Sequence, residues 1–172
     1  MNIASNPWSF VPTDVLATAI AASATGLVLQ ADGSVLLTTL GGAVHGLIAG
    51  NNVTVFNPTN LAYQGYYHVR SVPTTSTAVL VPGGIAIPAG TAASGGGIVA
   101  LNQYLYETRI EDLSWQNAAA LGQLLIVVDR NGFPIWEATA SGPGNQNRGK
   151  VFWVNGLTLI QMDAGILLAT VN

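Results

Sequence analysis

The chain has 172 residues, of which 49% are hydrophobic and only 8% charged, with a net charge of −3. Soluble domains usually carry about 25% charged residues, and five Lys and Arg residues in all argue against nucleic-acid binding, which needs a basic surface. The absence of cysteine excludes disulfides, thiol catalysis and cysteine metal sites.

The low charge also bears on the setting of the protein. Charge keeps free monomers dispersed, so we expect this chain to belong to an assembly that covers much of its surface. Its length suffices for one domain or two small ones, and either can bury a core.

Residues 1–20 are predicted to form an extended N-terminal arm. Pro7 and Pro12 favour extended backbone in the residues before them, and the segment carries two large aromatic residues, Trp8 and Phe10. Aromatic anchors contribute much of the binding energy of protein interfaces. We expect Trp8 and Phe10 to dock on a neighbouring subunit, with folding back onto their own domain as the alternative.

The sequence predicts neither a signal peptide nor a membrane span. Residues 1–10 contain no Lys or Arg, whereas a signal peptide begins with a basic region. Residues 15–29 are apolar but shorter and more polar than the roughly 20-residue span of a membrane helix. They are expected to form either a short helix over residues 18–24, with Asp14 as its N-cap, or a strand that leads into residues 27–30. No membrane partner is expected.

Residues 21–82 are predicted to form a small antiparallel domain of about five strands, a count that suits a barrel or sandwich of SH3-like or OB-like size. Asp32–Gly33 lies between two short apolar runs and is one of the strongest hairpin signals. Val72 is out of phase with the apolar residues before it, which predicts a bulge near Ser71.

The centre of this domain holds the most specific pattern in the sequence. It reads HGL, two residues, G, two residues, V-x-V, and then Y-x-G-Y-Y-x-V-x-S-V-P. This arrangement resembles a small β-module common in structural proteins of tailed bacteriophages, which has Asp at Asn51 and Asn at Gln64. The resemblance implies a fold module and a setting in a virion, without specifying which virion part. The matching residues are His45, Gly46, Leu47, Gly50, Val53, Val55, Tyr63, Gly65, Tyr67, Val69, Val72 and Pro73.

The composition changes over residues 83–100, which are uncharged and rich in Gly, Ala and Pro. Such a composition predicts a linker or surface loop. We place the boundary between two domains there.

Residues 101–172 are predicted to form an antiparallel β-sandwich, because several short strands are separated by regular turn signals. Asn131–Gly132 between two hydrophobic runs predicts a tight hairpin. The patterns D-x-x-G, V-x-G-L-x-L and D-x-G-x-L resemble a β-domain seen in phage particle proteins. The matching residues are Asp129, Gly132, Val154, Gly156, Leu157, Leu159, Asp163, Gly165 and Leu167.

Three predicted strands of this second domain, residues 124–128, 151–154 and 166–168, are apolar on both faces. Burying one large apolar side chain contributes about 1.5–3 kcal/mol, and exposed apolar patches promote aggregation. We expect the second face to be covered by the other domain or, given the low charge, by another subunit. A trimer would fit the geometry of a virion. The predicted interface residues are Trp8, Phe10, Trp136, Phe152 and Trp153.

The sequence offers little for catalysis. We expect His45 to hydrogen-bond the backbone at a turn and His68 to face solvent, rather than to share a metal ion. Glu107 and Glu111 would share a strand face next to Arg109, which favours a solvated row of charges over a glycosidase carboxylate pair. We predict no enzymatic activity, no cofactor and no metal site.

Together these features predict an all-β structural protein of a tailed-phage virion. The preferred role is an oligomeric capsid decoration or cement protein on the outer surface of the head, where it bridges major capsid subunits. Its partners would be the major capsid protein or another virion protein, and further copies of itself. The alternatives are a tail, connector or fibre-base component, and a carbohydrate-binding module that uses Trp136, Trp153 and nearby tyrosines.

Overall fold

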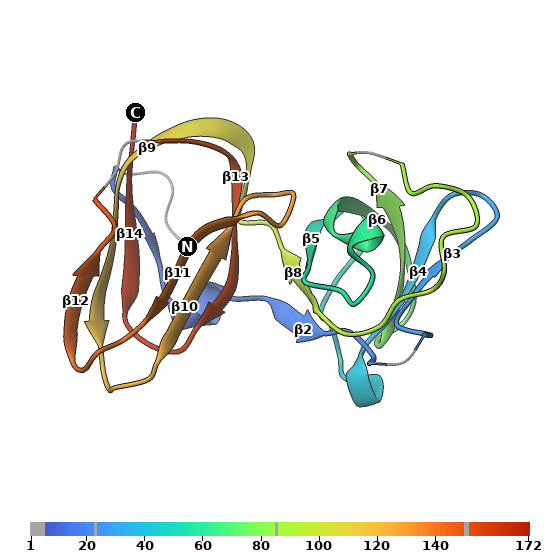
Figure 1. Cartoon of the computed structure of the whole chain (residues 1–172), viewed down its shortest axis with the longest axis horizontal. Coiled ribbons are helices and arrows are strands. Elements are labelled where there is room, and N and C mark those ends of the chain that lie inside the picture. The colour runs from blue at the N-terminus through green and yellow to red at the C-terminus, as the bar shows by residue number, and fades with distance from the viewer. Residues whose placement is uncertain (1–5, 23, 85, 150–151) are drawn as a thin grey trace. The chain divides into compact units, whose positions relative to one another are not determined.

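The computed structural model divides the chain into two compact units (Figure 1). Each unit is built on one antiparallel sheet, which confirms the prediction of an all-β chain with two antiparallel domains. Unit 1 comprises Met1–Val15, Gln103–Asp129 and Phe133–Asn172, and unit 2 comprises Leu16–Asn102 and Arg130–Gly132. The structure describes residues 6–22, 24–84, 86–149 and 152–172.

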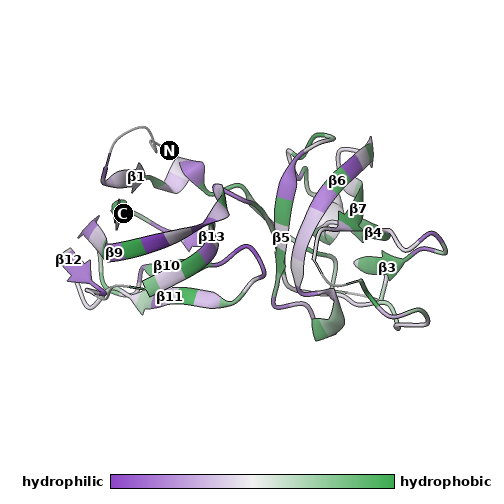
Figure 2. Ribbon diagram, turned by 90° about the horizontal axis from the view of Figure 1, so that it is seen from above, coloured by the Kyte–Doolittle hydropathy of each residue, from purple (hydrophilic) through white to green (hydrophobic). Residues whose placement is uncertain are grey.

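Unit 1 is a seven-stranded sheet in the order β1-β14-β9-β13-β10-β11, with β12 paired to β9. The sheet curls around a core that includes Phe10, Trp115 and Leu159. Hydrophobic and hydrophilic residues alternate along the long strand β9 (Figure 2), as expected where one face is buried. The strands are β1 (Trp8–Phe10), β9 (Tyr104–Ala118), β10 (Leu124–Val128), β11 (Pro134–Thr139), β12 (Gly144–Asn147), β13 (Phe152–Met162) and β14 (Ile166–Val171).

The described part of the predicted arm is not an arm but contributes a strand to each unit, β1 to unit 1 and β2 to unit 2. Residues 8–10 form β1 and pair with β14. Beyond them, the Asn6 side chain donates to the Val171 carbonyl at 2.7 Å and accepts from the Val171 N–H at 3.1 Å. Because alternate residues of a strand share a face, Trp8 and Phe10 both point into the core, where they are 7% and 0% exposed. The alternative that they fold back onto their own domain is therefore confirmed.

Unit 2 is a seven-stranded sheet in the order β2-β8-β5-β6-β7-β4-β3. An isolated bridge between Ile20 and Thr39 links the end of β2 to the end of β4 and curls the sheet. The core includes Leu37, Val53 and Tyr63. The strands are β2 (Ala17–Ala19), β3 (Leu27–Leu29), β4 (Val35–Thr38), β5 (Asn52–Phe56), β6 (Gly65–Thr74), β7 (Thr77–Pro82) and β8 (Ile98–Leu101); the short 3₁₀ turns of the chain are η1 (Pro12–Asp14), η2 (Leu40–Gly42) and η3 (Leu61–Tyr63).

Several local predictions are confirmed. The turn at Asp32–Gly33 joins β3 to β4, and the turn at Asn131–Gly132 joins β10 to β11, each as an antiparallel pair. The register of β6 against β7 shifts between Val69 and Ser71, which is the predicted bulge. The strand alternative for the residues after Asp14 is also correct, since β2 begins at Ala17 and pairs with β8.

Residues 83–100, predicted as a linker or surface loop, belong to unit 2. Residues 86–97 are largely an irregular loop, and β8 begins at Ile98. Ser94 exchanges two backbone hydrogen bonds with Leu27, at 2.8 and 2.9 Å, and β8 lies between β2 and β5 in the sheet. The many small residues were interpreted as a sign of flexibility, but here they allow close packing. A β-carbon on Gly97 would lie 2.5 Å from the carbonyl oxygen of Phe56. The division between the units falls between Asn102 and Gln103, within two residues of the predicted start of the second domain at residue 101, and no boundary falls at residue 82.

Candidate interaction surfaces

The five predicted interface residues lie in three different environments. Trp8 and Phe10 are in the core of unit 1, and Trp136 and Phe152 are half-buried and pack against it. Trp153 is 66% exposed. Of the five, only Trp153 presents most of its side chain to a partner. Trp136 and Trp153 also do not form one platform for a sugar, because Trp136 packs on the core while Trp153 points away from it.

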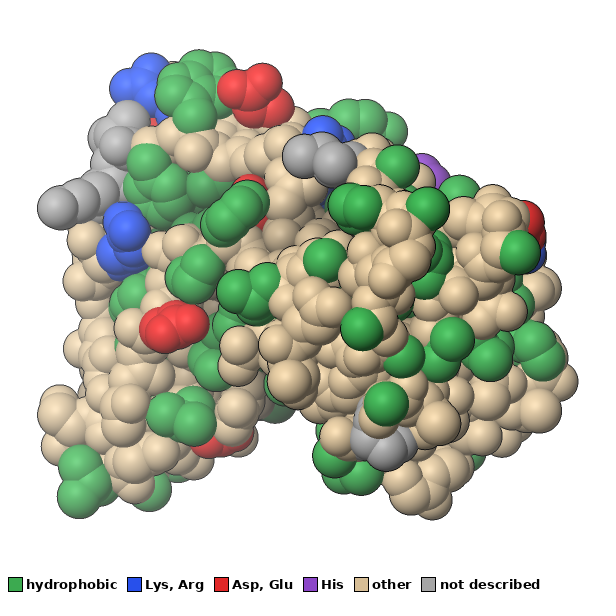
Figure 3. All heavy atoms as spheres, turned by 45° about the vertical axis from the view of Figure 1, so that its right-hand side comes forward, with side chains coloured by type: hydrophobic (Ala, Val, Ile, Leu, Met, Phe, Trp, Pro, Cys, Tyr) green, Lys and Arg blue, Asp and Glu red, His purple; other side chains and the backbone are tan. Residues whose placement is uncertain are grey.

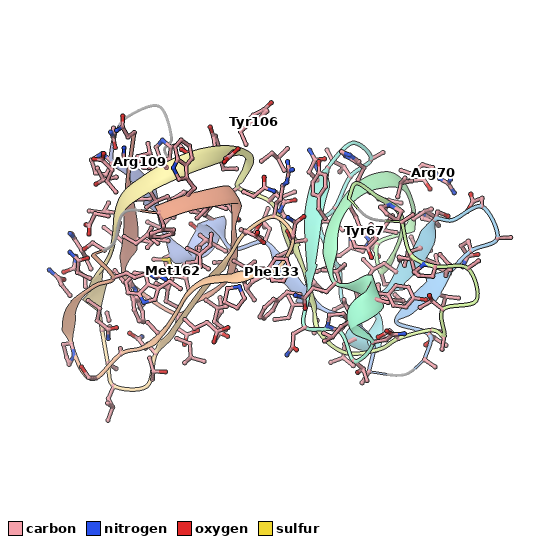
Figure 4. The ribbon with its side chains drawn as sticks, turned by 45° about the horizontal axis from the view of Figure 1, so that its top comes forward. Tyr67, Arg70, Tyr106, Arg109, Phe133 and Met162 are labelled. Carbon is pink, nitrogen blue, oxygen red and sulfur yellow. The ribbon has the colours of Figure 1, made fainter. Side chains whose placement is uncertain are left out.

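Trp153 stands on the outer face of β9 and β13 in unit 1. The register places Trp153 opposite Arg109 and Asn155 opposite Glu107, and directly opposed residues share a face of the sheet. On β9 these residues alternate with buried side chains, so Glu111 follows Arg109 on the same outer face. We call Glu107, Arg109, Glu111, Trp153 and Asn155 the Trp153 patch. Figure 4 labels Arg109 on β9.

The Trp153 patch contains three charged residues from the most charged segment of this sparsely charged chain. Four of the 13 charged residues fall within residues 107–112, whose sequence is ETRIED. An aromatic side chain surrounded by polar and charged ones is the arrangement typical of a binding hot spot and its rim. The patch therefore has the composition of a protein interface.

Unit 2 differs sharply from unit 1 in its charge. Its residue ranges contain three charged residues, Asp32, Arg70 and Arg130, and the first two form an ion pair at 2.8 Å. Figure 3 shows many hydrophobic side chains and few charged ones on one face of the molecule. The surface of unit 2 therefore lacks the charge that normally keeps a free domain in solution.

Hydrogen bonds from the side chain and backbone of Ser34, followed by the contact with Arg70, lower the pKa of Asp32 from 3.8 to about 2. Because the folded-state pKa lies below the unfolded one, the Asp32 carboxylate stabilises the fold above the unfolded pKa, and this stabilisation is lost as the pH falls through about 2. We expect Asp32→Asn to lower the midpoint of urea unfolding at neutral pH. The urea midpoints of the wild type and of Asp32→Asn should converge below a pH of about 2. A difference between these midpoints that is as large at that pH as at neutral pH would contradict this account.

A second candidate surface in unit 2 is the loop over residues 40–50, which we call the apolar loop. Leu40, Val44 and Ile48 project from it and are 51%, 69% and 65% exposed. Each of these side chains is aliphatic, and the loop carries no charged residue. Three exposed aliphatic side chains within nine residues form a compact surface for burial against another protein.

The apolar loop is held in shape by residues that point the other way. The His45 ring is buried, and its Nδ1 accepts the N–H of Leu47 at 2.9 Å. The backbone N–H of His45 donates to the Thr75 carbonyl at 3.1 Å. The expectation that His45 hydrogen-bonds the backbone at a turn is thus confirmed. Gly46 and Gly50 take φ values of 66° and 90°, which residues with a β-carbon rarely adopt.

The sequence interpretation missed the apolar loop because it considered residues 45–50 only as part of the phage-module pattern. The available signal was the alternation of glycines with aliphatic residues that no strand partner could cover. It also missed Tyr106, which is exposed at the start of β9 and labelled in Figure 4. The ring centroids of Tyr106 and Tyr104 are 5.6 Å apart, and those of Tyr104 and the buried Trp8 are 4.5 Å apart.

Chemically reactive clusters are not found in the part of the chain that the structure describes. Within it, no group of three or more His, Cys, Asp and Glu side chains is placed to hold a metal ion. His45 is committed to its turn, and His68 is exposed beside the Tyr66 ring. Two open hollows of about 320 and 340 Å³ flank the β3–β4 turn. The first has no charged lining residue, and the two charged residues that line the second, Asp32 and Arg70, already bind each other.

Comparison with known proteins adds no relative to this description. No family model matches the sequence, and no match was found among curated proteins or among solved structures. Among the described residues, no helix has the length and apolar character needed to cross a membrane.

Proposed function

We propose that this chain is a structural component of a tailed-phage virion, a decoration protein that binds the outer surface of the head and bridges major capsid subunits. The observation that carries the proposal is the apolar loop on a unit with only three charged residues. A surface of this kind suits a subunit that is covered by other proteins in its functional assembly. The activity is passive, since bound subunits stabilise the assembled head by mass action.

The energetics of the apolar loop agree with such a role. Covering Leu40, Val44 and Ile48 would contribute on the order of 1–2 kcal/mol each, given how much of each remains exposed. Because the loop is already fixed by His45 and by its glycines, little conformational entropy is lost when a partner covers it. A rigid apolar contact repeated over many subunits gives a stable coat.

The residues of the phage-module pattern support the virion setting. They build the core and the turns of unit 2: Tyr63 and Tyr67 are buried, and the Tyr67 hydroxyl donates to the Tyr63 carbonyl at 2.7 Å. The amide of Leu29 in turn donates to the Tyr63 hydroxyl at 3.3 Å. The pattern therefore coincides with a folded module, and the second half of the apolar loop, residues 45–50, belongs to it.

The proposal is tested by the binding of purified protein to phage heads that lack it. We expect wild-type protein to sediment with the heads, and the double substitution Val44→Asp with Ile48→Asp to weaken binding at least about tenfold, since each added carboxylate would have to be desolvated at the contact. Leu61→Asp, which alters an equally exposed aliphatic residue outside the loop, is the matched control and should still bind.

Two results would contradict the proposal. One is that wild-type protein does not bind heads, for example because it binds tails instead. The other is that the double variant binds heads as well as the wild type does. Because the substituted side chains are exposed, unchanged circular dichroism should show that every variant is folded.

A further inference from the structure

The exposure of Trp153 is unusual among the tryptophans of this chain. Trp8 and Trp115 are buried and Trp136 is half-buried against the core, whereas Trp153 is 66% exposed. Beneath it the sheet is firmly packed, because Val154 and Thr108 on the inner face are 7% and 8% exposed. The indole therefore stands on a rigid platform, and tryptophan is among the residues most enriched in binding hot spots.

The charges beside Trp153 alternate in sign along β9. Glu107, Arg109 and Glu111 lie on the same outer face as successive alternate residues, about 6.6 Å apart along the strand. Any partner with a single sign of charge would meet a like charge somewhere on this face. A strongly basic or strongly acidic partner is therefore disfavoured.

A second copy of the same face pairs Glu107 and Arg109, while Glu111 already accepts the side-chain amide of Asn172 at 3.0 Å within the chain. If two β9 strands oppose each other in antiparallel fashion, with a two-fold axis between residues 107 and 109, each Arg109 faces the Glu107 of the other copy. A two-fold axis makes every contact occur twice, so the pair of Arg109–Glu107 contacts forms together. Trp153, directly opposite Arg109 on β13, is then covered at the centre of the contact.

We propose that two copies of this chain associate face to face through the Trp153 patch, related by a two-fold axis. The contact uses residues of unit 1 only. It does not rest on the head-binding role, which is assigned to the apolar loop in unit 2. Head binding and self-association can therefore be tested, and can fail, separately.

The test is the molar mass of the full chain by analytical ultracentrifugation over a range of concentrations. We expect wild-type protein to dimerise, and Trp153→Ala, Arg109→Glu and Glu107→Arg each to weaken dimerisation at least about tenfold. Glu137→Arg is the matched control: it makes the same change in net charge as Glu107→Arg at an exposed position on β11 and should dimerise like the wild type.

The decisive experiment mixes two variants. Arg109→Glu makes the charged residues of the patch entirely acidic, and Glu107→Arg makes them predominantly basic. Neither variant should pair with itself, but an equimolar mixture should form a heterodimer, which also shows that both variants are folded. A wild-type protein that stays monomeric, charge reversals that leave dimerisation unchanged, or a mixture that does not associate would overturn the proposal. Binding of glycans by a monomer through Trp153 would also overturn it.

Discussion

Replacing Gly97 with alanine is expected to destabilise unit 2 by about 2–5 kcal/mol, the sum of left-handed backbone strain and overpacking. Gly97 has a φ of 79°, and an added β-carbon would lie 2.5 Å from the Phe56 carbonyl oxygen and 2.7 Å from that of Asn57. Both are backbone atoms at the end of β5, so they cannot rotate away as a side chain would. The carbonyl of Gly97 also accepts the Ile20 amide at 3.0 Å, which ties this position to the closure of the sheet.

Gly33→Ala is the matched control for this substitution. Gly33 has the same φ of 79°, but an added β-carbon there would meet no atom within 4 Å. The substitution should therefore show the backbone strain alone, about 1–2 kcal/mol. Urea unfolding of the two variants separates the effects: Gly97→Ala should be clearly less stable than Gly33→Ala. Equal stabilities would mean that the close approach of β8 to β5 is not a constraint.

Replacing Trp115 with alanine is expected to destabilise unit 1 by about 3–5 kcal/mol, as is typical when a large buried aromatic residue is truncated. Trp115 is fully buried near the C-terminal end of β9, and its indole N–H donates to the Ala164 carbonyl at 2.7 Å. Trp115→Phe keeps most of the apolar contact but removes the donor from that carbonyl. It should destabilise the unit by about 1–3 kcal/mol.

The exposed tryptophan provides the comparison for Trp115. Trp153→Ala removes the same side chain from the surface of the same unit and should change the stability of the monomer by less than about 0.5 kcal/mol. Thermal and urea unfolding at low protein concentration measure this ranking. If Trp153→Ala were as destabilising as Trp115→Ala, the Trp153 patch would be part of the fold rather than a surface for binding.

Much of the local structure was predictable because the signals are short-range. Asp32–Gly33 and Asn131–Gly132 define hairpins by their own backbone preferences, and the phase change before Val72 located a bulge. These features depend on residues within about one turn of each other. For the same reason, the β character of nearly the whole chain follows from its sequence.

The strand in the predicted arm and the strand at the end of the predicted linker or loop were missed because their structure depends on distant partners. Residues 8–10 become a strand by pairing with β14 at the other end of the chain, and residues 98–101 by insertion between β2 and β5. The local composition of these two segments, one containing prolines and the other rich in Gly and Ala, does not show that a strand elsewhere in the chain is available to pair with them.

The candidate surfaces show a related limit. Strand alternation predicts that Phe152 and Val154 share one face and that Trp153 occupies the other. It does not determine which face is inward, because the three residues are all apolar. The structure decides this through the partners on β9, where Ile110 and Thr108 are buried and Arg109 is not.

The most direct measurement of the proposed role is an electron cryomicroscopy map of phage heads to which the purified protein has been added. The account predicts density for both units on the outer head surface, with Leu40, Val44 and Ile48 buried against the major capsid protein. Heads without such density, or heads on which these three residues face solvent, would contradict it.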